Sequence, residues 1–272
     1  HLYEVAVDGT GLKQLTSGPF DDLMPCYLPD GGIAFISTRS QQFGRCHGSR
    51  YVPSYVLYRC EADGSNIRRI SFNEANEWNP AVMNDGRIIY TRWEYSDRTA
   101  GYLHSLFVMN PDGTNQTEFY GNNSQFPAAI LHARNVPNST KVIAIAGAHH
   151  IDQRGKLIMI DRNVGTQAGI GVKFLAPERD YPYRESMGTG GNIVHDTEGE
   201  QFQYPYPLDE DNYVVSYSPE GGPVRGLKGI KGGKAGSPSF GIYWMHCNGQ
   251  RELLIYDPVI SSGQQVPTTR SR

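Results

Sequence analysis

The sequence predicts an all-β fold, a β-propeller of four-stranded antiparallel blades, and three observations support this expectation. A pattern of turn, strand, Asp-Gly turn and strand occurs twice, with its two copies 55 residues apart. Shorter hairpins with their own Asp-Gly turns recur along the chain. The 272 residues include 31 Gly, 17 Pro and 17 Tyr, a composition that suits many strands joined by tight turns.

The repeated pattern covers Leu15–Arg39 and Ile70–Trp93. Each copy has an acidic turn, a proline, an apolar run, an Asp-Gly pair and a β-branched strand that leads to Thr-Arg. Because Asp-Gly pairs favour type I′ turns, we expect positive φ at both central residues, for example at Asp30 and Gly31. A strand-only repeat of this length favours a propeller blade over a solenoid turn.

The order of the hairpins predicts how the blades follow one another. We expect outer hairpins near residues 1–15, 55–70, 105–119, 156–174 and 242–259. We expect inner strand pairs near residues 20–38, 76–93, 125–147 and 200–218. Each outer pair precedes the next inner pair, which predicts a ring closed by strands from both ends of the chain. We therefore assign residues 1–265 to a propeller of about five or more blade units, and 266–272 to a linker toward further domains of a longer chain.

Charge and composition exclude several kinds of partner. The formal net charge of -3 gives no basic footprint for a nucleic acid. No apolar run reaches the roughly 18 residues that a membrane helix needs. The chain begins at His1 without a signal peptide, so we expect a mature or truncated polypeptide. The four cysteines form no CxxC or CxxCH motif, so we expect no haem attached to this chain and no cofactor from its sequence, with a metal ion left open.

The adjacent pair Cys46 and His47 is a candidate metal site. A thiolate and an imidazole suit zinc, copper or haem iron, but adjacent residues rarely bind one metal together. A further ligand would then come from Cys26, Cys60 or His195. The alternative is a structural Cys46 that is buried in its loop or paired with Cys60.

A second candidate site is the pair His149 and His150, which follows the apolar segment Val142–Ala146. Side chains alternate along a strand, so one imidazole would face the central channel as a ligand or proton carrier. The alternative is a hydrogen-bonded structural histidine.

Three charged residues from other blades complete this hypothetical channel mouth. Asp22 and Glu77 precede inner strands at the same offset in their repeats, and Arg92 ends the second inner hairpin. We expect that they approach the mouth beside the histidine pair, with the Cys46 loop covering it. Acidic residues before a strand also commonly bind backbone amides, so a structural role for Asp22 and Glu77 is the alternative.

Tyrosines alternate with prolines in two segments of the chain. They are Tyr181, Tyr183, Tyr204 and Tyr206. They would line a ligand groove or, alternatively, pack against the prolines.

Several strings of the sequence are similar to those of known families. LTSGPFDDLMPCYLPDGGIAFIS resembles the Pro-Asp-Gly repeat of TolB-like β-propellers. More specific are FGRCHGS, NEWNPAVMNDGRIIYTRWEYSDR, LFVMNPDGTNQ, YGNNSQFP, TKVIAIAGAHH, GKLIMID and QYPYPL. In that order they resemble the propeller region of the hydrazine synthase alpha-subunit-like family, from about Leu15 to the end of the chain.

This resemblance implies a propeller that precedes domains binding c-type haem, in a periplasmic or extracellular protein. It implies a protein partner, a c-type cytochrome or haem domains. Cys46, His47, His149 and His150 match motif positions of the family, without an assigned catalytic role. Because CxxCH is absent, the redox chemistry of the family does not transfer to this chain.

The sequence therefore favours an exported scaffold or binding domain associated with a haem protein. Two alternatives stay open. The chain is part of a haem- or metal-dependent redox enzyme whose catalytic domains lie elsewhere, or it is a TolB-like module that binds glycans or peptides. The residues do not decide whether the protein is an enzyme.

Overall fold

The computed structural model describes residues 1–44, 52–95, 103–124, 126–147, 153–176, 199–219, 240–257 and 262–263. Within these ranges all regular structure is β-strand, so the predicted all-β fold class is confirmed. No helix that could cross a membrane is found in this part of the chain. The motif residues Cys46, His47, His149, His150 and His195 lie outside the described ranges.

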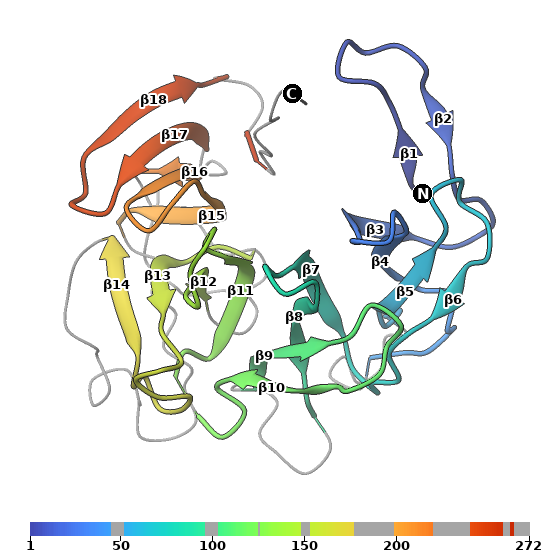
Figure 1. Ribbon diagram of the computed structural model, residues 1–272, viewed down its shortest axis with the longest axis horizontal. Coiled ribbons are helices and arrows are strands. Elements are labelled where there is room, and N and C mark those ends of the chain that lie inside the picture. The colour runs from blue at the N-terminus through green and yellow to red at the C-terminus, as the bar shows by residue number, and fades with distance from the viewer. Residues whose placement is uncertain are drawn as a thin grey trace.

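The strands form four antiparallel blades of four strands each (Figure 1). The first blade contains β3 (Asp22–Tyr27), β4 (Ile33–Ser37), β5 (Val56–Cys60) and β6 (Arg68–Arg69). The second contains β7 (Glu77–Val82), β8 (Ile88–Trp93), β9 (His104–Met109) and β10 (Thr117–Tyr120). The third contains β11 (Ala129–Asn135), β12 (Val142–Gly147), β13 (Lys156–Ile160) and β14 (Val172–Ala176). The fourth contains β15 (Gln201–Pro207), β16 (Asn212–Ser218), β17 (Gly241–His246) and β18 (Arg251–Ile255).

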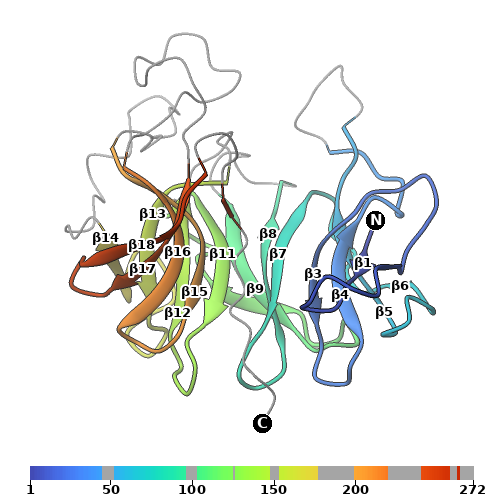
Figure 2. The ribbon, with the colours of Figure 1, turned by 90° about the horizontal axis from the view of Figure 1, so that it is seen from above.

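The blades surround a common axis, with β3, β7, β11 and β15 innermost (Figure 1). A single parallel bridge between Ala129 and His104 joins the sheets of the second and third blades. A separate hairpin, β1 (Tyr3–Glu4) and β2 (Lys13–Gln14), lies beside the first blade, on the side of the molecule opposite β14 and β18 (Figure 2). The described strands leave the ring open between the fourth blade and this hairpin. The extent of the propeller over 1–265 and the linker over 266–272 stay predictions.

Apolar side chains between neighbouring blades form the core. Ile36 of the first blade packs with Ile88 of the second, and Leu106 of the second packs with Ile130 of the third. Burial of this kind contributes about 1.5 to 3 kcal/mol for each large aliphatic side chain. Apolar side chains therefore pack against both faces of the inner strands. This packing fixes the position of the residues that these strands place at the axis.

The Asp-Gly pairs all lie in hairpin turns, as predicted, but the expected type I′ geometry is wrong. In the first blade Gly31 has φ 85°, whereas Asp30 does not have positive φ. The Gly31 N–H donates to the Leu28 carbonyl at 2.9 Å, and the Leu28 N–H donates to the Gly32 carbonyl at 2.7 Å. The Asp30 side chain accepts the Gly32 N–H at 3.0 Å, which fixes the aspartate as a turn residue and leaves only glycine in the left-handed region. These are three-residue hairpins that end in a left-handed glycine.

Each inner strand contains a β-bulge, a feature that the sequence pattern did not predict. The register shifts lie between Leu23 and Cys26, Trp78 and Ala81, Leu131 and Arg134, and Gln203 and Tyr206. A residue other than glycine has positive φ inside each bulge: Met24 (53°), Asn79 (54°), His132 (53°) and Tyr204 (46°). We call these four the axial residues. Such backbone conformations cost of order 1 kcal/mol or more each and gather at functional sites.

Candidate binding site at the propeller axis

A cavity of about 250 Å³ lies where the four inner strands meet. The residues that line it come from all four blades: Met24, Pro25, Asn79, Pro80, Ala81, His132, Ala133, Arg134 and Tyr204. All four axial residues are among them, so the strained bulges form the wall of the cavity. Tyr204, one of the four tyrosines singled out in the sequence, lies in this wall.

Hydrogen bonds link the axial residues from one blade to the next. The Met24 Sδ accepts the Asn79 N–H at 3.4 Å, and the Asn79 Oδ1 accepts the His132 N–H at 3.3 Å. The His132 Nδ1 in turn accepts the Tyr204 N–H at 3.2 Å. In each step the side chain of one blade accepts the backbone N–H at the same position of the next blade. We call this series the axial relay.

The bulges explain why these N–H groups are available. The extra residue of a β-bulge is left out of the ladder of its own sheet, so its backbone N–H needs another acceptor. Sulfur, amide oxygen and imidazole nitrogen each serve as this acceptor in turn. The blades therefore share the backbone geometry of the relay while its side chains differ.

His132 is held as a neutral imidazole. Its Nδ1 accepts from Tyr204, so Nε2 carries the proton and donates to the Gln153 Oε1 at 3.2 Å. Burial lowers the pKa of His132 to about 3. The ring also packs against the Tyr204 ring, with 4.0 Å between centroids and the two planes tilted by 31°. Gln153 accepts a second hydrogen bond from the Asn79 Nδ2 at 3.3 Å, which fixes the orientation of that amide.

Arg134 and Cys26 contribute the remaining polar chemistry near the cavity. The Arg134 guanidinium lies over the Tyr206 ring at 5.3 Å from its centroid, a cation–π contact. Burial lowers the pKa of Arg134. Burial also raises the pKa of the Cys26 thiol to about 12, against the opposing effect of the Arg134 charge, so this thiol stays protonated at neutral pH.

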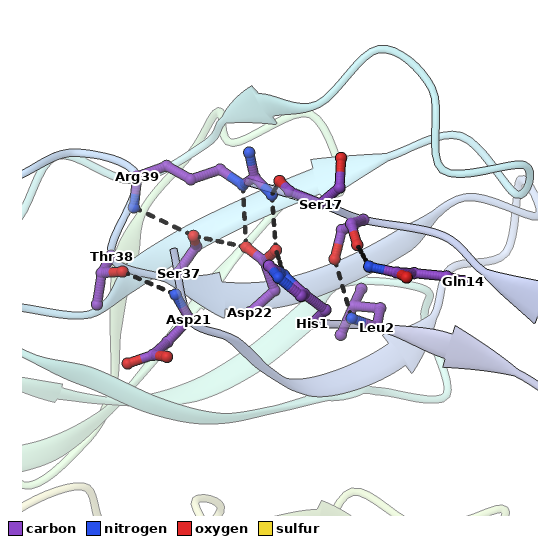
Figure 3. A network of polar contacts seen from close by, with 10 residues as sticks. His1, Leu2, Gln14, Ser17, Asp21, Asp22, Ser37, Thr38 and Arg39 are labelled. Carbon is purple, nitrogen blue, oxygen red and sulfur yellow. Dashed lines mark hydrogen bonds and ion pairs between the residues drawn. The ribbon is translucent and has the colours of Figure 1, made fainter. Parts of the chain in front are cut away.

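Asp22 does not line the cavity but anchors the start of β3 (Figure 3). The Arg39 guanidinium donates to both carboxylate oxygens, at 2.9 and 2.6 Å, and the Ser37 hydroxyl donates at 2.7 Å. His1 approaches the same carboxylate at 3.5 Å. Burial alone would raise the pKa of Asp22, but the hydrogen bonds from Arg39 and Ser37 outweigh it and hold the pKa below its usual value. Asp22 therefore has its partners within its own blade and the adjoining N-terminal segment.

Glu77 is fully buried at the start of β7. The Ser71 hydroxyl and the Leu57 N–H donate to its Oε2, the latter at 3.1 Å. Burial raises the pKa of Glu77 to about 7, although these two hydrogen bonds and the Arg92 charge oppose the shift. The expected structural role, bonding to a backbone amide, is therefore present at Glu77.

Arg92 is the cross-strand neighbour of Glu77 in the second blade. Its Nε lies 3.3 Å from the Glu94 carboxylate, and its guanidinium lies over the Phe107 ring at 5.0 Å. The structure thus brings Glu77 and Arg92 together and leaves Asp22 with Arg39. The predicted channel mouth with His149 and His150 stays a prediction, because that pair lies outside the described residues.

Sequence reasoning missed His132 and Arg134. A signal was present: the inner strands contain the dipeptides Met24-Pro25, Asn79-Pro80 and Tyr204-Pro205. Aligning the inner strands on these dipeptides places His132 at the same position, although alanine follows it instead of proline.

The described residues also bear on the metal and disulfide hypotheses. Cys26, Cys60 and Cys247 are free thiols. Among the residues with described positions, no group of three or more His, Cys, Asp or Glu side chains could hold a metal ion. The candidate metal ligands Cys46 and His47 are not among them.

No family model and no curated protein matches the sequence. Among solved structures, the chain is similar to hydrazine synthase from Kuenenia stuttgartiensis, with a TM-score of 0.66 and 19% identity. That match covers 94% of this chain and 35% of the other, so this chain spans about a third of it. TolB from Agrobacterium tumefaciens matches with a TM-score of 0.52 and 13% identity, over 92% of this chain and 72% of the other. The predicted resemblance to hydrazine synthase and TolB-like propellers is confirmed at the level of the fold.

Proposed function

We propose that this chain is the binding propeller of an exported protein, a rigid scaffold whose axial cavity takes a ligand or a segment of a partner. The observation that carries the proposal is the cavity itself. All four inner strands contribute to it, and each does so through a residue in a strained conformation. A protein keeps such strain where the surrounding structure over-determines it, and functional sites are the usual place.

The chemistry of the cavity wall supports binding. His132 is neutral and both of its ring nitrogens are engaged in hydrogen bonds. Next to the wall, the thiol of Cys26 has a pKa that burial raises to about 12, far above the range of a nucleophilic cysteine. The wall therefore offers fixed dipoles, apolar surface and one cation, the groups that orient a small ligand.

The partner and location that we propose follow from the resemblance in sequence and fold. The solved hydrazine synthase chain is about three times as long as the part that this chain matches. We propose that the propeller serves haem domains or a c-type cytochrome in the periplasm or outside the cell. The competing function is a metal- or haem-dependent redox enzyme to which the propeller contributes a wall. Metal analysis of the purified chain separates the two, because stoichiometric zinc, copper or iron would favour the enzyme.

A substitution at the rim of the cavity tests the binding site. Pro25 is exposed and lines the cavity, so Pro25→Trp should block it without disturbing the core. The matched control is Pro137→Trp in the exposed turn after β11. A panel of small carboxylates, amides, sugars and short peptides is screened by saturation-transfer NMR. We expect at least one class to bind the wild type and the control but not Pro25→Trp. Binding that survives Pro25→Trp for every class, or no binding at all, would contradict the proposal.

A further inference from the structure

Arg134 is the one charged residue among the described residues that line the axial cavity. It lies on β11, two residues after the axial His132, at the end of the bulge. The side chains around it are apolar or neutral, and they include Pro25, Pro80 and Ala133. The site therefore holds a cation against a largely apolar wall.

Several other arginines of the blades are paired with carboxylates, whereas Arg134 is not. Arg39 binds Asp22 at 2.6 Å, and Arg59 binds Asp30 at 2.9 Å. Arg251 binds Glu200 at 2.6 Å. Arg134 has no ion pair and donates no hydrogen bond within the described ranges, and its contact there is with the face of the Tyr206 ring.

The neighbouring acceptors do not compensate for the missing counter-ion. The Asn79 Oδ1 accepts the His132 N–H, and the His132 Nδ1 accepts the Tyr204 N–H. These atoms are committed to the axial relay. A partly buried guanidinium without an acceptor loses hydration without replacement, which is costly unless an anion binds. The same loss of hydration on burial lowers the pKa of Arg134.

We propose that Arg134 binds the carboxylate of a small ligand whose apolar part lies against the prolines and the Tyr204 ring. This inference rests on the proposed function and names its ligand class. The planar guanidinium matches a carboxylate with two parallel hydrogen bonds. A phosphate dianion would call for more donors, and no second cationic side chain is among the lining residues. A cavity of about 250 Å³ suits a compact organic acid.

Calorimetric titration of the whole chain with benzoate tests the proposal. Benzamide serves as the uncharged analogue of the same shape, and phenyl phosphate as the other anion. We expect benzoate to bind at least roughly tenfold more tightly than benzamide. Arg134→Gln should remove that preference, and the control Arg68→Gln, an equal charge change on the exposed outer strand β6, should keep it. Thermal unfolding checks that each variant folds. If Arg134→Gln does not fold, Arg134→Lys replaces it and should weaken benzoate several-fold.

The other possible results of these titrations would overturn the carboxylate inference. Equal binding of benzoate and benzamide, abolished by Pro25→Trp, would overturn the carboxylate inference and leave the proposed function standing. Tighter binding of phenyl phosphate than of benzoate would overturn it in favour of phosphate. A preference for benzoate that survives Arg134→Gln, or no binding of benzoate, would also overturn it. A peptide with a free C-terminal carboxylate, compared with its amide, then distinguishes a partner's terminus from a free acid as the source.

Discussion

The first and second blades have a carboxylate at the same place, two residues before the axial residue, in opposite electrostatic settings. Asp22 is bound at both oxygens by Arg39, and its pKa is lowered. Glu77, 55 residues later, accepts from a hydroxyl and a backbone N–H, and burial raises its pKa to about 7. Both side chains are almost inaccessible to solvent, but only Asp22 has a guanidinium bound to its carboxylate, which opposes the effect of burial.

The repeat itself explains this difference. The position that corresponds to Arg39 in the second blade is Glu94, and Glu94 takes Arg92 as its own partner at 3.3 Å. Among the described residues Glu77 therefore forms no ion pair, although its cross-strand neighbour Arg92 lowers its pKa through charge. The third and fourth blades have apolar residues, Ile130 and Phe202, at the same position. The charge at the strand start thus varies freely between blades, whereas the bulge and the axial relay occur in every inner strand.

The largest effect is expected from removing the paired carboxylate. Asp22→Ala leaves the Arg39 guanidinium and the Ser37 hydroxyl without their acceptor, and breaking such a buried pair costs about 3 kcal/mol or more. Urea unfolding monitored by fluorescence measures the loss. Asp21 is exposed, and within the described ranges its carboxylate accepts one hydrogen bond, from the Tyr55 hydroxyl, so Asp21→Ala is the control and should cost less than about 1 kcal/mol. Equal losses at the two positions would remove the contrast between the blades.

Glu77→Gln is expected to change how stability depends on pH. The pKa of Glu77 is raised to about 7 from an ordinary value of 4.5, so the folded state binds the extra proton between these two pH values. The stability of the wild type relative to Glu77→Gln should therefore fall as pH rises from 4.5 through 7, by about 2 to 3 kcal/mol. Unfolding free energies of both proteins at pH 4.5, 6 and 8 check this.

Asp22 should show the opposite slope. Its pKa is lowered from 3.8, so its stabilisation is complete above that pH and is lost as pH falls below it. Comparison of the wild type with Asp22→Asn between pH 5 and pH 2.5 measures this loss. If the unfolding free energy depended on pH in the same way at Asp22 and at Glu77, the two carboxylates would not differ in their electrostatic environment.

Substitution of the axial residue His132 tests whether its position needs only a hydrogen-bond acceptor at positive φ, as in the other blades, or the imidazole itself. His132→Asn keeps an acceptor for the Tyr204 N–H, as Asn79 does for His132, and asparagine tolerates positive φ. It should cost less than about 1 kcal/mol. His132→Leu leaves the Tyr204 N–H without its acceptor and removes one of the two hydrogen bonds to the Gln153 Oε1, so it should cost about 2 kcal/mol. Thermal unfolding that ranks these variants in the reverse order would argue that the imidazole itself is required.

The smallest effect is expected in the turns after β3 and β7. Gly31 and Gly86 have φ 85° and 84°, and valine at either position would cost on the order of 1 kcal/mol from backbone strain. A Cβ at Gly31 meets no atom within 4 Å, whereas one at Gly86 lies 3.3 Å from the Pro29 Cγ. Gly86→Val should therefore lower the melting temperature slightly more than Gly31→Val. A melting temperature for Gly86→Val equal to that of the wild type would contradict the turn assignment.

The parts of this structure that the sequence predicts are those with local causes. Asp-Gly pairs mark the hairpins because the aspartate side chain and the glycine backbone together determine the turn. The type I′ expectation fails because Asp30 binds the Gly32 N–H and keeps φ negative. The axial residues escaped prediction because they are four different residue types, and the proline that follows three of them marks their position only when the inner strands are aligned with one another. Met24 and His132 have little in common except the inter-blade hydrogen bonds that the closed packing provides.

Arg134 shows the same limit at the candidate site. In the sequence it is an arginine in a strand, and only the packing of four blades reveals that it faces a cavity without a carboxylate partner. Asp22, Glu77 and Arg92 attracted attention through charge, and the structure gives each of them a partner outside the cavity. An unpaired charge is a property of the fold, and it is more informative about binding than charge alone.

The most direct test of the axial cavity as a binding site is the NMR spectrum of the Arg134 side chain during a benzoate titration. Arginine Nε–H signals, assigned by comparison with Arg134→Gln, report contact with an anion at the guanidinium itself. We expect the Arg134 Nε–H and the backbone N–H of Tyr204 to shift in a saturable manner, while the Arg68 Nε–H does not move. If the Arg134 and Tyr204 signals stay unchanged while benzoate binds elsewhere or not at all, the axial cavity is not the carboxylate site that we propose.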